Sequence, residues 1–340
     1  MDQKEALEKS LSLFDLCRKE LAKKIVGQQD MVDGLLTGLV AGGHILLEGV
    51  PGLAKTLAVK SLAEITGLHF KRIQFTPDLL PADLTGTLIW EQNTGTFSVR
   101  KGPVFANVIL ADEINRAPAK VQSALLEAME EKQVTIGETT YPLPEPFFVL
   151  ATENPIEHEG TYSLPEAELD RFLMKLLVSY PEPDEELEIV SRAAPIAANA
   201  GAVSALSPVL DMNSLALLRS AADTIHVDQR IAEYMVSIVT ATRPAATRSG
   251  LTQSGKTQAA GEGLYRYLAF GASVRSSIAL HKCSRIRALC EGRAFVSPED
   301  VKAAAVPCLR HRIVLSYEAE AEGLNADAVI ARLLSHVPVP

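Results

Sequence analysis

The stretch 44–66 constrains the fold of this chain more than any other part of the sequence. A short apolar run at 45–47 leads into a glycine-rich turn, and Thr56 opens a segment, LAVKSLAEI, whose apolar residues recur at helical spacing. These patterns predict a strand, a tight loop and a helix in direct succession.

The loop between this strand and this helix reads GVPGLAKT, residues 49–56. It resembles a phosphate-binding loop, in which backbone N–H groups and a helix N-terminus hold phosphate groups. In such a loop Lys55 contacts the terminal phosphates and the hydroxyl of Thr56 binds Mg²⁺. The expected nucleotide-binding residues of this segment are Gly49, Pro51, Gly52, Leu53, Ala54, Lys55, Thr56 and Leu57.

Two residues distinguish this loop from the strict pattern. The strict pattern has glycine before the lysine, whereas this chain has Ala54. Alanine is small enough for the loop to close on a phosphate if the backbone at this residue avoids positive φ. Pro51 has no N–H group, so the donors that face the phosphates are expected from residues 52–56.

A second stretch, GLTQSGKT at 250–257, matches the strict pattern in every letter. No apolar strand precedes it, and its flanks are rich in Pro, Ala, Thr, Ser, Gln and Gly, a composition typical of a mobile loop. Because the motif needs a strand before it and a helix after it, we assign the nucleotide site to 49–56 and interpret 244–263 as a mobile loop.

Composition and charge exclude several classes of protein. The formal net charge is −9, which disfavours sequence-independent nucleic-acid binding. The four cysteines form no C-x-x-C pair and no zinc spacing, as expected for reduced thiols in a cytoplasmic protein. No uncharged apolar run reaches the length of a membrane span, and the charged N-terminal residues do not resemble a signal peptide.

Two later apolar runs end in polar residues. The run 104–111 is typical of a strand buried on both faces of a parallel sheet, and it ends in Asp112 and Glu113. Placed near the phosphate-binding loop, Asp112 can hold Mg²⁺, and Glu113 can polarise the water that attacks the γ-phosphate. The run 147–151 predicts another buried strand, after which Asn154 either orients that water or forms an Asn-Pro turn.

Two hairpins and a change of composition complete the predicted architecture. Alternating runs at 88–92 and 96–100, and at 134–136 and 140–141, predict β-hairpins. The segment PEPDEE, 181–186, marks the expected boundary between a domain at 1–182 and a domain at 183–340. Beyond it the predicted elements are all helical, and Ser297 followed by proline predicts a helix N-cap. Helical periodicity is found at 185–194, 213–225, 228–242, 272–291 and 298–305.

Four motifs in fixed order resemble those of the AAA+ ATPases, and more closely those of the MoxR family. They are GVPGLAKT, ILADEINRAP, VLATENP and EAELDRF, and the resemblance runs from about residue 25 to the last residues of the chain. In that family the loop has alanine at the place of Ala54. The resemblance implies an α/β fold, with a P-loop core of three layers around a parallel sheet and a smaller all-α lid domain at the C-terminus.

The resemblance also implies roles for single residues. Lys55 and Thr56 would form Walker A, Asp112 and Glu113 would form Walker B, Asn154 would be sensor 1, Arg171 the arginine finger and Arg275 the sensor 2 arginine of the lid. The family commonly has proline at the place of Val274, which makes the start of that lid helix less certain than the role of Arg275. Val26, Gly27 and Gln28 would line the adenine pocket.

From these residues we expect an enzyme that hydrolyses ATP with Mg²⁺. The resemblance implies a homo-hexamer that acts as a chaperone-like remodeller or maturation factor on a protein client, with a partner carrying a von Willebrand factor A domain. One alternative is a nucleotide-dependent binding module without hydrolysis, against which Glu113 argues. The other is a motor like magnesium chelatase or one that acts on DNA, and the acidic net charge makes nucleic acid an unlikely partner.

Overall fold

The computed structural model describes residues 3–156, 160–193, 205–244 and 264–340, which form two compact units. The sheet unit comprises Ser12–Arg171 and Leu176–Ala216, and the helical unit comprises Met1–Leu11, Phe172–Lys175 and Leu217–Pro340. This division differs from the predicted boundary near residue 182, because the chain enters the helical unit briefly at 172–175 and returns to the sheet unit until 216. The proposed mobile loop and the second phosphate-loop pattern fall at 245–263, outside the described residues.

A five-stranded sheet with the order β2-β5-β8-β1-β9 organises the sheet unit. The pairs β2·β5, β5·β8 and β8·β1 are parallel. Parallel strands need crossover connections: α5 lies in the one between the neighbours β5 and β8, and α3 lies in the connection from β1 to β2 at the far side of the sheet. The strands of this sheet are β1 (Ile45–Glu48), β2 (Phe70–Gln74), β5 (Val108–Asp112), β8 (Phe148–Glu153) and β9 (Met174–Leu177). The first two residues of β9 belong to the segment 172–175, which is assigned to the helical unit. The helices that precede or connect the strands are α1 (Gln3–Ala22), α2 (Gln29–Ala41), α3 (Lys55–Thr66), α4 (Pro81–Thr85), α5 (Ala119–Glu131), α6 (Glu166–Leu169) and α7 (Pro183–Ala193).

Burial confirms the prediction of a sheet covered on both faces. Every residue of β5 is buried, and β8 is buried as far as Thr152. Near-continuous apolar strands of this kind are typical of parallel sheets whose crossover helices cover both faces. The predicted α/β class is therefore correct.

Three elements differ from the prediction. The strand β5 begins at Val108 and not at 104, since Pro103–Phe105 forms a 3-10 turn, η1. Val104 extended the apolar run in the sequence because it is buried within this turn. The segment 164–172 has a sequence that predicts a short helix, but the helix α6 covers only Glu166–Leu169 and begins after Pro165. The strand β9 was not predicted, because four residues are too few to show a periodic pattern.

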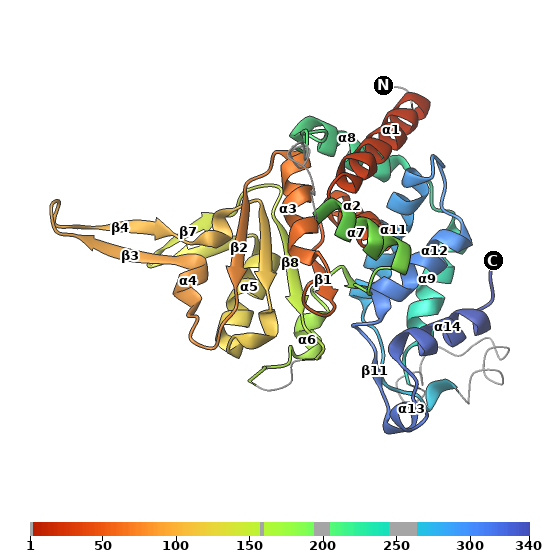
Figure 1. Cartoon of the computed structure of the whole chain (residues 1–340). Coiled ribbons are helices and arrows are strands. Elements are labelled where there is room, and N and C mark those ends of the chain that lie inside the picture. Colours follow the sequence, from red (N-terminus) through yellow and green to blue (C-terminus); the bar gives the residue numbers. More distant parts are fainter. Residues whose placement is uncertain (1–2, 157–159, 194–204, 245–263) are drawn as a thin grey trace. The chain divides into compact units, whose positions relative to one another are not determined.

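Both predicted hairpins are present in the sheet unit. The first is formed by β3 (Gly86–Glu91) and β4 (Thr96–Lys101), and it projects away from the five-stranded sheet (Figure 1). The rings of Trp90 and Phe97 pack edge to face across it, with centroids 5.0 Å apart. The second is formed by β6 (Gln133–Ile136) and β7 (Thr139–Pro142). The predicted insertions are thus confirmed as antiparallel additions to an otherwise parallel architecture.

Helices dominate the helical unit, but it also contains a short antiparallel pair of strands, β10 (Leu268–Phe270) and β11 (Val314–Leu315). The predicted helical lid is confirmed, and the short strand pair is an addition that was not predicted, because strands of three and two residues leave no alternating pattern. The helices are α8 (Met212–Thr224), which begins in the sheet unit, α9 (Gln229–Ala241), α11 (Val274–Cys290), α12 (Pro298–Leu309), α13 (Tyr317–Ala321) and α14 (Ala326–His336).

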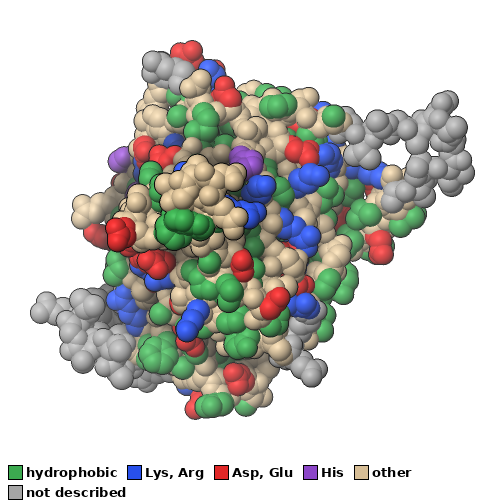
Figure 2. Space-filling view, turned by 90° about the vertical axis from the view of Figure 1, so that its left-hand side faces the viewer, with side chains coloured by type: hydrophobic (Ala, Val, Ile, Leu, Met, Phe, Trp, Pro, Cys, Tyr) green, Lys and Arg blue, Asp and Glu red, His purple; other side chains and the backbone are tan. Residues whose placement is uncertain are grey.

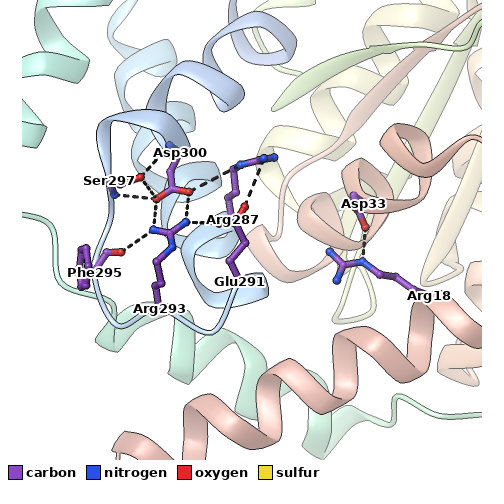
Figure 3. Close-up of polar contacts among 8 residues, drawn as sticks. All are labelled: Arg18, Asp33, Arg287, Glu291, Arg293, Phe295, Ser297 and Asp300. Carbon is purple, nitrogen blue, oxygen red and sulfur yellow. Dashed lines mark hydrogen bonds and ion pairs between the residues drawn. The ribbon is translucent and has the colours of Figure 1, made fainter. Parts of the chain in front are cut away.

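The predicted N-cap of α12 is confirmed and is reinforced by an arginine. Ser297 and Asp300 form a capping box, and the Asp300 carboxylate is almost fully buried. Arg293 donates to both carboxylate oxygens of Asp300 at 2.6 Å, as Figure 3 shows. Figure 3 also shows the bond from Arg18 to Asp33, 2.7 Å long, which links α1 to α2 within the sheet unit. No helix among the described residues combines the length and the apolar character needed to cross a membrane.

A buried histidine precedes β1 and ties three segments of the sheet unit together. The backbone N–H of Val149 donates to Nδ1 of His44 at 3.0 Å, so the ring proton resides on Nε2, which lies 3.2 Å from the carbonyl oxygen of Met129. Burial lowers the pKa of His44 to about 4. The neutral ring is therefore the form that the folded state favours.

We expect this histidine to make the protein less stable in mild acid. The depressed pKa contributes stability that is complete above pH 6.5 and is lost as the pH falls toward 4. At pH 5 the loss is on the order of 2 kcal/mol. Urea unfolding at pH 7.5 and 5.0 measures it, with His44→Asn as the control that cannot titrate. An equal pH dependence in the two proteins would contradict the assignment.

Candidate nucleotide site

The predicted phosphate-binding loop connects β1 to α3 as expected. Gly49 is required there, because a Cβ on this residue would lie 2.7 Å from the carbonyl oxygen of Val178. The N–H groups in the first turn of α3 have no partner within the helix, so this turn presents donors and the positive end of the helix dipole. Pro51, Gly52 and Leu57 are exposed around it. The loop can therefore receive an anion from solvent.

Ala54 adopts the backbone conformation that the sequence analysis treated as a condition to be avoided. Its φ is +56°, in the left-handed region, directly before the first residue of α3. An L-residue with a Cβ is strained there by roughly 1–2 kcal/mol relative to right-handed backbone. The condition of a φ that is not positive is thus not met, and the loop retains the glycine-like geometry with a residue that is less suited to it.

Lys55 lies half-buried at the start of α3 and its ammonium group donates to the carbonyl oxygen of Gly49. Burial lowers the pKa of Lys55, while the carboxylates of Asp112, Glu113 and Glu48 raise it. The ammonium group therefore lies in the field of the acidic residues at the ends of β1 and β5. Of these, Asp112 and Glu113 were expected beside the loop from the sequence.

The carboxyl ends of β1, β8 and β5 meet at one edge of the sheet. Leu47 pairs with Thr152 across β1 and β8, and Ala111 pairs with Ala151 across β5 and β8. Since β8 lies between the other two strands, its last residues separate the phosphate-binding loop from the acidic pair. Open α/β sheets bind their ligands at such an edge.

Thr152 connects the two acidic residues of the site. Its hydroxyl donates to Oδ1 of Asp112 at 2.6 Å and accepts the backbone N–H of Glu113 at 2.8 Å. Both bonds are short and well buried, and Thr152 is 1% exposed. A single hydroxyl therefore fixes both the carboxylate of Asp112 and the backbone that carries Glu113.

Glu113 has a strained backbone and a carboxylate held by two side chains. Its φ is +57°, which is rare for a residue other than glycine and is stabilised here by the bond to Thr152. Gln74 donates to its Oε2 at 2.6 Å, and Nε of Arg116 lies 3.2 Å from the same oxygen. The side chain is thus directed to one position at the edge of the sheet.

Asp112 provides oxygen atoms of the kind that Mg²⁺ prefers. Arg72 donates to its Oδ2 through two nitrogens, at 2.9 and 2.6 Å, while Thr152 binds Oδ1. No group of three His, Cys, Asp or Glu side chains that could hold a metal occurs among the described residues. A Mg²⁺ ion at Thr56 and Asp112 would therefore also need phosphate oxygens and water, which is the usual arrangement for this ion. The donor set fits the ion on these terms.

Asn154 follows β8 directly and is buried. Its Oδ1 accepts the backbone N–H of Ile156 at 3.2 Å, so the side chain stabilises the turn after the strand. The two readings of the sequence are therefore compatible: the residue forms the Asn-Pro turn and stands at the edge of the sheet beside the phosphate-binding loop.

Arg171 follows α6 in the sheet unit and contacts a glutamate of the same chain. Its Nε lies 2.9 Å from Oε2 of Glu130 on α5, without the alignment of a hydrogen bond. Both side chains are partly exposed, at 29% and 37%. Exposed ion pairs of this kind contribute about 0–1 kcal/mol, so this pair does not restrain Arg171 strongly.

Residues 26–28, expected at the adenine, precede α2 in the sheet unit. Gly27 and Gln28 both have positive φ, at +63° and +55°, and the Gln28 side chain donates to the carbonyl oxygen of Ser179 at 2.8 Å. The positive φ of Gly27 explains the glycine, because an L side chain is strained in this conformation. Val26 is half-buried. The segment is therefore a fixed turn.

Arg275 lies in the first turn of α11 in the helical unit and is exposed. Ser273 caps this helix by accepting the N–H of Arg275 at 3.1 Å. The helix begins at Val274 even though the proline common in the family is missing, so the serine cap supplies the start signal.

Sequence reasoning missed four residues that hold the acidic pair: Thr152, Arg72, Gln74 and Arg116. Thr152 stands in the strand-end motif, but no pattern marks its hydroxyl as a bridge. Arg72 and Gln74 alternate along β2, which suggested only a half-exposed strand. Their function follows from the pairing of β2 with β5, where Gln74 lies opposite Asp112.

We expect Lys55→Ala to weaken nucleotide binding by ~10- to 100-fold, the value of one charge-assisted hydrogen bond. Titration calorimetry with ATP measures the affinity. The matched control is Lys256→Ala, which changes the same residue in the second copy of the pattern. If the control lost affinity and Lys55→Ala did not, the site would lie at 250–257.

Known proteins resemble this chain along nearly all of its length. Two family models match it: the ATPase family associated with various cellular activities (AAA) at 44–174, and the AAA lid domain at 265–333. "Chaperone MoxR1" of Mycobacterium tuberculosis is 46% identical over 94% of this chain and 81% of its own length. "Protein MoxR" of Methylorubrum extorquens is 30% identical over 95% of this chain and 94% of its own length. The crystal structure of a proposed ATPase from Cytophaga hutchinsonii superposes with a TM-score of 0.86 at 46% identity, covering 99% of this chain and 98% of the other. The chain therefore belongs to the MoxR family of AAA ATPases.

Proposed function

We propose that the edge of the sheet formed by β1, β8 and β5 is the ATPase site, with Lys55 and Thr56 on the phosphates and Asp112 and Glu113 beside them. The observation that carries this proposal is the Thr152 hydroxyl, which bonds to both acidic residues at once. With this bridge, the carboxylate of Asp112 is available to a cation and that of Glu113 to a water molecule. Asn154 and the turn at 26–28 complete the nucleotide site.

We further propose that hydrolysis depends on Mg²⁺ held by Thr56 and Asp112. The ion, when bound, would neutralise charge on the phosphate oxygens. The pair of Arg72 with Asp112 does not prevent this, because Arg72 contacts only Oδ2, and Oδ1, which accepts the Thr152 hydroxyl, has a second lone pair. Glu113 then accepts a proton from the water that attacks the γ-phosphate, and Gln74 and Arg116 keep its carboxylate in place.

Glu113→Gln should bind Mg-ATP with nearly unchanged affinity and hydrolyse it about 10²–10⁴-fold more slowly. The amide keeps the size of the carboxylate but cannot accept the proton. Phosphate release and nucleotide affinity are measured on the same preparation. Wild-type turnover in this variant would remove Glu113 from the mechanism.

Assembly is the second part of the proposal. We infer a homo-hexamer in which Arg171 reaches the nucleotide of the neighbouring subunit and Arg275 acts as sensor 2. What supports this is the weak restraint on Arg171, which could exchange Glu130 for a phosphate at little cost. An arginine in that position is worth roughly 10³–10⁵ in rate.

Two inactive variants should regain activity when they are mixed. Arg171→Ala retains its own phosphate-binding loop, and Lys55→Ala retains its arginine, so mixed rings contain complete interfaces. We expect partial recovery of ATP turnover at a 1:1 ratio, with each variant alone as the control. Absence of recovery in rings that demonstrably contain both variants would show that Arg171 acts within its own subunit.

The proposed client is a protein, and the proposed partner carries a von Willebrand factor A domain, as the family resemblance implies. The net charge of −9 and the mixture of basic and acidic side chains on the face in Figure 2 favour a protein over a nucleic acid. The four cysteines are free thiols, which supports a cytoplasmic location. Glu113→Gln with bound ATP is the bait for these partners, and capture of nucleic acid in place of protein would contradict the proposal.

A further inference from the structure

Three consecutive side chains of the helical unit contact the backbone of the segment 172–175. They are Arg310, His311 and Arg312, which follow the last turn of α12. The segment they hold begins at Phe172, the residue directly after Arg171. We name Arg310, His311 and Arg312 the carbonyl clamp.

Arg312 forms the centre of the carbonyl clamp. Its Nη2 donates to the carbonyl oxygen of Phe172 at 2.7 Å, and its Nη1 donates to those of Leu173 at 3.3 Å and Cys308 at 2.9 Å. The guanidinium group therefore connects two successive peptide groups of the segment to the end of α12. Its planar fork of donors makes this possible, whereas lysine has a single ammonium group.

His311 and Arg310 hold the same segment at its two ends. Nε2 of His311 lies 3.1 Å from the carbonyl oxygen of Phe172, and Arg310 donates to that of Lys175 at 3.3 Å. Arg310 is itself oriented by Asp327, with bonds of 2.9 and 2.8 Å. The carbonyl groups of Phe172, Leu173 and Lys175 thus receive donors from side chains of the helical unit.

Burial makes these contacts more valuable than surface hydrogen bonds. Phe172 is fully buried, and His311 and Arg312 are 5% and 9% exposed. Burial lowers the pKa of His311 well below its usual range, so the ring is neutral and has one N–H to donate. A buried carbonyl that loses its donor costs about 1–3 kcal/mol, which the backbone can relieve only by moving.

We propose that Arg312 and His311 are positioning residues for Arg171, which they hold through the backbone of Phe172. The inference rests on the proposed role of Arg171 at the neighbouring subunit's nucleotide. Consecutive Cα atoms are 3.8 Å apart, so a shift of Phe172 moves the base of the Arg171 side chain directly. The helical unit of one subunit then sets how well that subunit serves the nucleotide of the next.

Arg312→Lys tests this role with the charge preserved. We expect turnover of ATP to fall about 10- to 100-fold, since a displacement on the order of 1 Å costs about that much in rate. The affinity for Mg-ATP should stay within about twofold of wild type, because the substitution leaves the phosphate-binding loop of the variant unchanged. Arg230→Ala is the matched control, because Arg230 is a 76% exposed arginine of the same unit and forms its ion pair with the neighbouring Asp228.

Mixing separates a positioning role from a structural one. An Arg312→Lys subunit with a misplaced Arg171 still has an intact phosphate-binding loop, so mixing it with Lys55→Ala should restore turnover as mixing Arg171→Ala does. Damage confined to the variant's own nucleotide site would give no recovery. The inference is overturned if Arg171→Ala recovers and Arg312→Lys does not, or if Arg312→Lys turns over ATP like wild type.

The same mixing experiment also shows whether the underlying proposal, that Arg171 acts on the nucleotide of a neighbouring subunit, is wrong. If neither Arg171→Ala nor Arg312→Lys recovers with Lys55→Ala, the action of Arg171 on a neighbour is wrong, and the positioning role is rejected with it. If Arg312→Lys melts below the assay temperature, His311→Asn replaces it, since this variant removes only one donor to Phe172. Recovery on mixing supports the inference in either variant, and its absence beside a recovering Arg171→Ala rejects it.

Discussion

The hydroxyl group of Thr152 fixes the two acidic residues of the proposed nucleotide site. It donates to Asp112, the last residue of the neighbouring strand β5, and accepts the N–H of Glu113, which follows that strand. Valine has the same shape but offers neither bond. Because β8 lies between β5 and β1, a residue at its end can touch the acidic pair and adjoin the phosphate-binding loop. The remaining contacts, from Arg72, Gln74 and Arg116, refine an arrangement that this hydroxyl establishes.

Backbone strain is concentrated at the same edge of the sheet. Four residues other than glycine have positive φ among those described, and three of them, Gln28, Ala54 and Glu113, are expected nucleotide-site residues. Each such conformation costs on the order of 1–3 kcal/mol and persists only where the surroundings enforce it. Glu113 is enforced by Thr152, and Gln28 by its bond to Ser179. Strain is thus found where groups must point in one direction.

The two units are linked by a short excursion of the chain. Residues 172–175 lie in the helical unit although the chain before and after them lies in the sheet unit. Donors from Arg310, His311 and Arg312 explain this, because they satisfy carbonyl groups of that excursion. The boundary predicted near residue 182 does not include this excursion, because composition indicates linkers but gives no information on hydrogen bonds.

The sequence by itself determined the local elements and the motifs from which the site is proposed. Glycines, apolar periodicity and polar strand ends predicted the phosphate-binding loop, both hairpins, the buried strands before Asp112 and Asn154 and the cap at Ser297, because each is encoded within about ten consecutive residues. Only the tertiary structure decided the contacts between residues about forty positions apart: Thr152 with Asp112, Gln74 with Glu113, and Arg171 with Glu130. These depend on which strands and helices become neighbours, and the positive φ of Ala54 depends likewise on the closed loop. Local patterns carry no information on either, because the order of strands in a sheet results from the packing of the whole unit.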